Sequence, residues 1–174
     1  MRGLLVCGFV LAAALGVSGC GYHVAGNSAR FPSDWKTIAV PAFTNDTTTY
    51  RVEQRFTEAV IREFIERTKF RITSTADSSD ATLHGEVISV ETAPVLFNAT
   101  TGEVTTMLVT VHTKVELVDN RTQKSVYENK DMVFRSEYQI SPDVKSFFEE
   151  QDPALDRLSR DLASHIVSSV LEGF

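Results

Sequence analysis

The sequence predicts an α+β fold, with two helices packed on one face of a mostly antiparallel sheet of four to five strands, in the order β-α-β-β-β-β-α. Three observations predict it. Two segments, residues 50–68 and the C-terminal part, have apolar residues every three to four positions, as amphipathic helices do. Between them, long runs carry strand-like patterns separated by turn residues. A short, almost wholly apolar run precedes the first helix.

The first strand is expected at residues 37–43 (TIAVPAF), which are apolar enough to be buried on both faces. Pro41 has no N–H to donate, so it should lie near a sheet edge or at the strand end. Residues 44–48 form a turn cluster that offers an N-cap for the following helix. The helix is expected over residues 50–68, where four apolar residues recur at i+4: Val52, Phe56, Val60 and Phe64.

A short strand is expected at residues 70–73, followed by three long strands at 81–97, 104–118 and 125–138. In the middle run, one face carries Met107, Val109, Val111, Val115 and Leu117, and the other carries Thr106, Thr110, His112, Lys114 and Glu116. Turn residues separate the runs, which predicts consecutive antiparallel hairpins. Because such strands exceed the usual five or six residues, the ribbon should project beyond the rest of the sheet.

The last helix is expected to begin at Asp152-Pro153, an N-cap residue followed by a proline at the first helical position. Its apolar face continues to Gly173 through five residues: Leu155, Leu158, Leu162, Ile166 and Val170.

Residues 1–19 have the pattern of a lipoprotein signal peptide. Arg2 is followed by an uncharged apolar segment that is too short for a bilayer span, and small residues precede Cys20. This resembles a lipobox, so we expect cleavage before Cys20 and attachment of diacylglyceryl and palmitate chains there. Residues 20–36 would be the lipidated tether, and residues 37–174 a single domain. An ordinary secretion signal with an accidental cysteine is the alternative.

Cysteine content and charge agree with this interpretation. The chain has 2 cysteines, and Cys7 lies in the segment to be removed, so the mature protein could form no internal disulfide. Arg2 is the only charge in residues 1–19, so the mature balance is 16 − 23 = −7. An acidic chain disfavours nucleic acid as a partner. Gly21 follows the cysteine, which, by resemblance to the sorting rule of enteric bacteria, favours the outer membrane.

The sequence contains no catalytic or metal motif. The 4 histidines are far apart, no serine lies in a nucleophile motif, and no phosphate loop is present. We therefore expect a protein that is not an enzyme and has no metal or cofactor. Arg51, Arg55 and Arg62 are candidates for contact with a partner or lipid. Interleaved glutamates make a solvated face with i,i+4 ion pairs one interpretation, and a patch for phosphorylated lipid the other.

Several segments together resemble one family. They are Cys20-Gly21-Tyr22-His23-Val24, Val95-Leu96-Phe97-Asn98, the run Met107–Val111, and the stretch from Val133 to Asp152. With the element order, they are similar to the LPS-assembly lipoproteins of Gram-negative bacteria, the plug subunits of the outer-membrane lipopolysaccharide translocon. The resemblance implies a protein seated inside a large β-barrel outer-membrane LPS-assembly protein, helping to assemble it and binding lipopolysaccharide during its export.

The same resemblance implies contact sites at Phe97, Asn98 and Lys145. Members of the family carry a basic residue after the loop aromatic, where this chain has Asn98, and another near the last helix, close to Phe147 and Lys145.

A second resemblance keeps another function open. Residues 37–45 are also similar to the opening strand of periplasmic lipoproteins that activate a cell-wall synthase or scaffold a secretion pore. A lipoprotein with only a scaffolding role is a third possibility.

Overall fold

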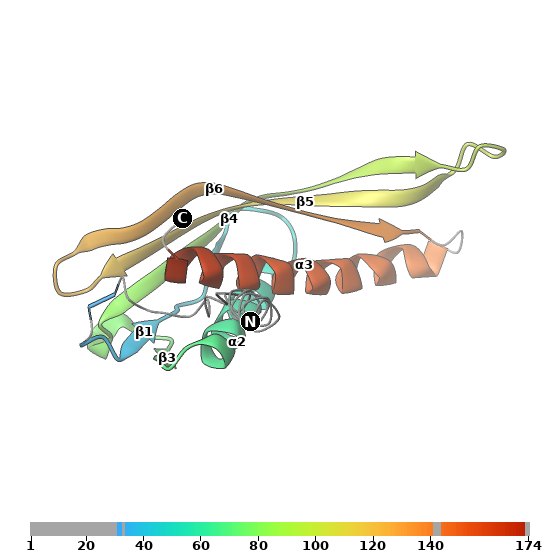
Figure 1. Cartoon of the computed structure of the whole chain (residues 1–174). Coiled ribbons are helices and arrows are strands. Elements are labelled where there is room, and N and C mark those ends of the chain that lie inside the picture. Colours follow the sequence, from blue (N-terminus) through green and yellow to red (C-terminus); the bar gives the residue numbers. More distant parts are fainter. Residues whose placement is uncertain (1–30, 33, 141–143, 173–174) are drawn as a thin grey trace, which may run out of the picture.

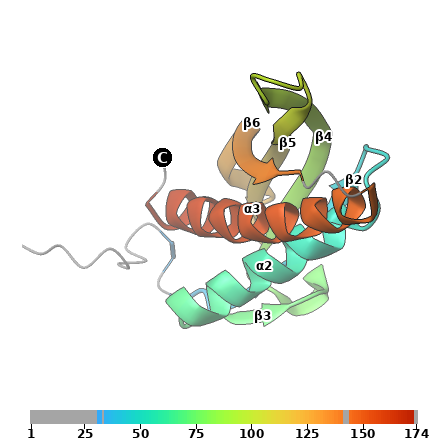
Figure 2. The same ribbon diagram turned by 90° about the vertical axis from the view of Figure 1, so that its right-hand side faces the viewer.

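The computed structural model describes residues 31–32, 34–140 and 144–172, with the backbone alone for residues 144–151. Two helices cover one face of an open sheet, as expected (Figures 1 and 2). The elements are β1 (Thr37–Ala39), β2 (Thr44–Asn45), α2 (Val52–Arg67), β3 (Arg71–Thr73), the 3-10 helix η1 (Ala76–Ser78), β4 (Ala81–Phe97), β5 (Val104–Asp119), β6 (Lys124–Gln139) and α3 (Val144–Glu172). The predicted α+β fold is confirmed.

The sheet has a parallel and an antiparallel part. Its order is β3-β1-β4-β5-β6, with β2 also paired to β4. The three long strands form antiparallel hairpins, whereas β1 is parallel to both β3 and β4. Because β1 lies between two strands and its apolar residues reach the core, its run is almost wholly apolar. The strand is Thr37–Ala39 and so ends earlier than the predicted residue 43; Pro41, which has no N–H to donate, lies two residues beyond its end.

One hydrophobic core joins the helices to the sheet. The predicted apolar face of α2 is completely buried at Val52, Phe56, Val60 and Phe64, and the five predicted positions of α3 are buried as well. On β5, Val109, Val111, Val115 and Leu117 are buried as predicted, and Met107 is partly buried. The opposite face is partly exposed except at Thr106, which is buried, contrary to the prediction. A fully buried large apolar side chain stabilises the fold by about 1.5–3 kcal/mol, so this core dominates the folding free energy.

The two helices run parallel and are joined at two places. Arg55 Nη1 donates to Asp156 Oδ1 over 2.8 Å, and Arg67 Nη1 donates to Ser168 Oγ over 2.6 Å. Both bonds link residues separated by 101 positions in the chain, so α2 and α3 keep a constant register.

Both helices begin differently from the prediction. The N-cap of α2 is Arg51, in the left-handed conformation with φ 54° and without a side-chain capping bond, so residues 44–48 do not cap it. Asn45 instead bonds Thr47 and Glu53. Helix α3 begins at Val144 and contains Pro153. An interior proline costs about 3 kcal/mol. Arg55 binds both the carboxylate and the carbonyl of Asp152, the residue just before this proline.

The β4–β5 hairpin projects beyond the helices (Figure 1). β2 pairs with β4 only as far as Val87, and within the described residues no other strand pairs with β4 on that side beyond this point. The predicted projection of the ribbon follows from this, because more than half of β4, from residue 88 to Phe97, has a neighbouring strand on one side only.

Two aromatic residues ahead of β1 also belong to the core. Phe31 and Trp35 are buried, and their rings stack with centroids 5.1 Å apart. Phe70 packs edge-on against Phe31 at 5.9 Å. The packed part of the chain therefore includes Phe31. In the part of the chain that the structure describes, neither helix has the length and apolar character needed to cross a membrane.

Candidate functional site

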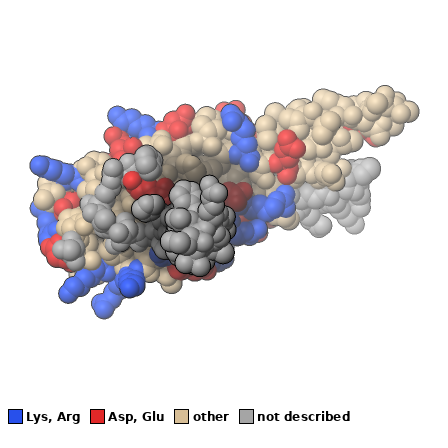
Figure 3. Space-filling view, viewed as in Figure 1, with Lys and Arg blue, Asp and Glu red and all other residues tan. Residues whose placement is uncertain are grey.

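The free end of the β4–β5 hairpin is apolar and exposed. From Thr92 to Gly102 the chain has no charged residue. Val95 is 40% exposed, and Leu96 and Phe97 are each 55% exposed. The space-filling view shows this projecting end almost free of charge, whereas charged side chains surround the main body (Figure 3). A projecting apolar end of this kind is typical of a surface that contacts a partner or a lipid.

Asn98 shapes the turn at this end. Its Oδ1 accepts hydrogen bonds from the N–H groups of Thr100 (2.8 Å) and Thr101 (3.1 Å). The backbone closes the turn through Gly102, which has a φ of 71° and donates its N–H to the Asn98 carbonyl. Asparagine is suited to this role because its side chain mimics a backbone turn. The side-chain oxygen of Asn98 is therefore occupied within the turn, and Phe97 is held at its base.

The three candidate arginines lie along α2 but have different surroundings. Arg51 lies at the start of the helix over the ring of Tyr50, with its guanidinium carbon 4.9 Å from the ring centroid. Arg55 is bonded to Asp152 and Asp156 of α3. Arg62 is exposed and has no ion pair or hydrogen bond within the described part of the chain. The structure therefore brings Arg55 and Arg62 to one hollow and leaves Arg51 apart from them, and within the described residues no contact links the three to Phe97.

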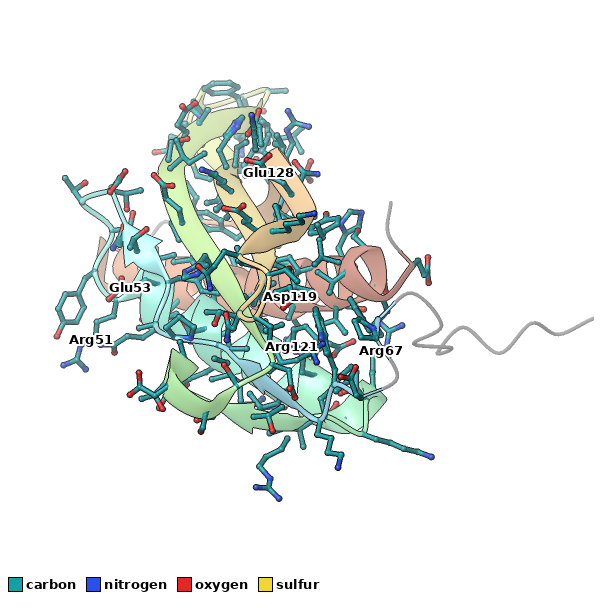
Figure 4. The ribbon with its side chains drawn as sticks, turned by 90° about the vertical axis from the view of Figure 1, so that its left-hand side faces the viewer. Arg51, Glu53, Arg67, Asp119, Arg121 and Glu128 are labelled. Carbon is teal, nitrogen blue, oxygen red and sulfur yellow. The ribbon has the colours of Figure 1, made fainter. Side chains whose placement is uncertain are left out.

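A separate charged cluster holds the segment before β1 against the β5–β6 turn. The Arg121 guanidinium donates to the Asp34 carboxylate and lies 4.0 Å from Asp119 (Figure 4). The hydrogen bond from Arg121 holds the pKa of Asp34 below its usual value. Burial alone would raise the pKa of Asp119, but the N–H groups of Arg121 and Thr122 donate to its carboxylate and lower it overall. We call Asp34, Asp119 and Arg121 the clamp.

Neither the clamp nor the unpaired state of Arg62 was predicted from the sequence. Asp34 and Arg121 are 87 residues apart, and no periodic pattern connects them. Among the candidates, Cys20 lies outside the described residues, as does the side chain of Lys145. Within the described residues, no group of three or more metal-ligating side chains gathers.

The chain is similar to one protein family over most of its length. A family model described as LptE, lipopolysaccharide-assembly, matches residues 35–170. A search of curated protein sequences gave no match.

Solved structures with the same fold include bacterial lipoproteins. Lipoprotein B from Nitrosomonas europaea is 12% identical, with a TM-score of 0.57 over 88% of this chain and 92% of that one. Rare lipoprotein B from Shewanella oneidensis is 13% identical, with a TM-score of 0.56 over 78% and 95%. A protein from Xanthomonas campestris is 14% identical, with a TM-score of 0.56 over 81% and 89%. At these identities the likeness concerns the fold.

Proposed function

Because this chain belongs to the lipopolysaccharide-assembly family LptE, we propose that it is an outer-membrane lipoprotein that plugs and helps to assemble the β-barrel lipopolysaccharide translocon. In this role it binds lipopolysaccharide during export to the cell surface. It acts by occupying space and offering contacts, and it performs no chemistry of its own. Its lipid anchor is attached at Cys20, and its domain lies inside the barrel lumen.

The apolar end of the β4–β5 hairpin is the observation that carries this proposal. Val95, Leu96 and Phe97 are exposed at the end of a ribbon that has only one neighbouring strand. Leaving apolar area in water costs about 25 cal/mol per Å², so a partner that covers this end gains free energy. The acyl chains of lipopolysaccharide and apolar side chains of the barrel both have the required chemistry.

The uncovered face of the sheet supports placement inside a barrel. On this face, Glu86 of β4 lies opposite Lys114 of β5, and His84 of β4 lies opposite Glu116 of β5. These side chains are exposed or partly exposed. Lumens of outer-membrane barrels are polar, so a polar sheet face can exchange hydrogen bonds with the wall. The apolar hairpin end and the polar sheet face thus suit two different surroundings.

Affinity purification from outer membranes tests the assembly role. The full chain with a C-terminal tag should retain a stoichiometric β-barrel protein, and depletion of the chain should lower the amount of assembled barrel. Recovery of a cell-wall synthase or a secretion pore in place of the barrel would support the alternative lipoprotein class and refute the proposal.

A photo-crosslinking amino acid at Phe97 tests lipopolysaccharide contact. Val126 is a matched control, because it is 45% exposed and lies at the opposite end of the ribbon, beside the β5–β6 turn. Lipopolysaccharide adducts are expected at Phe97 and not at Val126. Equal capture at both positions, or capture of lipopolysaccharide at Val126 alone, would contradict a role for the hairpin end.

A further inference from the structure

A hollow of about 190 Å³ lies between α2 and α3, on a part of the surface that the proposed function does not use. Three arginines line it, Arg55 and Arg62 from α2 and Arg160 from α3. Glu58 and Asp156 line it too, and Ala59 leaves room because its side chain is a single methyl group. The hollow lies between the two bonds that fix the helix register, Arg55–Asp156 and Arg67–Ser168, so its walls are held at a constant spacing.

The three arginines differ in what they bind. Arg55 donates to Asp152 and Asp156, and these two carboxylates more than balance its single positive charge. Arg62 and Arg160 have no hydrogen bond or ion pair within the described residues. Glu58, one helical turn before Arg62, lies farther than 4.0 Å from both guanidinium groups. Two unpaired guanidinium groups from different helices therefore line one hollow.

We propose that this hollow binds a phosphate group, with Arg62 and Arg160 donating hydrogen bonds to its oxygens from opposite walls. Guanidinium groups are planar forks whose paired N–H donors match phosphate oxygens, and such charge-assisted bonds are about twice as strong as neutral ones. The whole chain has a net charge of −6, so its overall field repels anions. Anion binding then requires a local site such as this one.

The hollow also accounts for the amino acids around it. Ala59 provides the space, since a larger residue at this position would fill it. Arg55 holds the two helices that form the walls together by binding Asp152 and Asp156 of α3. Because it donates to these carboxylates, it does not act as a ligand for the phosphate. Glu58 opposes the ligand by charge and limits its affinity.

Isothermal titration calorimetry of the detergent-solubilised full chain with inorganic phosphate tests the site. We expect saturable binding that weakens about tenfold in Arg62→Gln and in Arg160→Gln, because each loses a hydrogen bond between charged groups. Glu58→Gln should tighten binding severalfold by removing a repelling charge. Ala59→Leu keeps every charge but fills the hollow, so it should abolish binding while circular dichroism shows an unchanged fold.

Arg71→Gln is the matched control. Arg71 is an exposed arginine on β3 whose side chain has no partner among the described residues, and it does not line the hollow. No phosphate binding by the wild-type chain, equal weakening by Arg71→Gln, or retained affinity in folded Ala59→Leu would each overturn the proposal. Mixed micelles containing phosphatidic acid identify the source of the phosphate. Competition by these micelles indicates a lipid headgroup, whereas binding of inorganic phosphate alone indicates a free anion.

Discussion

The ring of Phe43 lies directly over Gly85, on the helix-facing side of β4, where a Cβ on Gly85 would overlap its atoms. Phe43 is 3% exposed and belongs to the core. The chain between β1 and β2 therefore packs against β4 through an aromatic ring, at a position where only glycine leaves enough room.

Gly85→Ala is expected to lower the free energy of unfolding by about 1–3 kcal/mol, as overpacking of a core does. Denaturant unfolding of the purified chain measures the change. In a Phe43→Leu background the same substitution should cost less, because a smaller side chain can move away. Additive effects of the two substitutions would show that they do not share this contact.

Thr57 joins the same loop to α2. Its hydroxyl accepts the Phe43 N–H over 2.9 Å and donates to the Glu53 carbonyl over 2.6 Å. Thr57→Val leaves the buried Phe43 N–H without an acceptor, so stability should fall by about 1–3 kcal/mol. Thr57→Ser keeps the hydroxyl and should cost clearly less in the same denaturant measurement. A loss in Thr57→Ser as large as that in Thr57→Val would contradict this, because it would mean that the methyl group contributes as much as the hydroxyl.

The clamp should make the free energy of unfolding depend on pH. The pKa of Asp34 is held low by Arg121, so its contribution is present above the ordinary aspartate pKa of about 3.9 and is lost as pH falls through the lowered value. Arg121→Gln should raise the pKa of Asp34 toward its ordinary value, as followed by NMR of the carboxyl carbon. The difference in stability between variant and wild type should shrink below about pH 4. Arg71→Gln should leave the Asp34 titration unchanged.

Substitutions in the buried face of α2 and at its exposed N-cap should change stability by very different amounts. Phe64 is fully buried, so Phe64→Ala should cost about 3–5 kcal/mol, and Phe64→Asp should prevent folding. Arg51→Ala removes an exposed side chain and should change stability by no more than about 0.5 kcal/mol. Thermal unfolding followed by circular dichroism compares them. A large loss in Arg51→Ala would indicate that its contact with Tyr50 supports the helix start.

Anchoring is expected to depend on Cys20, because it follows the lipobox Val17-Ser18-Gly19. Cys20→Ala should abolish acylation and leave an uncleaved or mislocalised precursor, as seen by mass spectrometry and membrane fractionation. Cys7→Ala is the control, since the expected cleavage removes that residue. An unmodified Cys20 in the wild-type mature protein would refute the expectation.

The fold could be predicted because most of its signals are periodic. Burial on one face produces the i+4 pattern of Val52, Phe56 and Val60 and the alternation along β5. Both patterns can be recognised in a short stretch of sequence. Helix starts were predicted less well. Asp152-Pro153 has the composition of an N-terminus, yet Asp152 binds Arg55 and the helix continues through Pro153. That contact comes from another helix, so the sequence around the proline does not indicate it.

The charged sites were less predictable for the same reason. Arg55 and Arg62 have similar neighbours in the sequence, but α3 supplies two carboxylates to the first and none to the second. The partner of Arg121 lies 87 residues away. The apolar hairpin end was visible because Val95, Leu96 and Phe97 are consecutive in the chain.

The clamp lies at one end of β5 and the hairpin end lies at the other, so the length of β5 sets the distance between them. β5 has 16 residues, so the two ends are about 50 Å apart. Phe31 already packs in the core, so Cys20 is joined to the packed part of the chain by 31 − 20 = 11 residue steps, which span at most about 40 Å. With a lipid on Cys20, the hairpin end can therefore lie as far as about 90 Å from the anchoring leaflet. Shortening the segment 21–30 would lower this maximum distance without altering either the ribbon or the clamp.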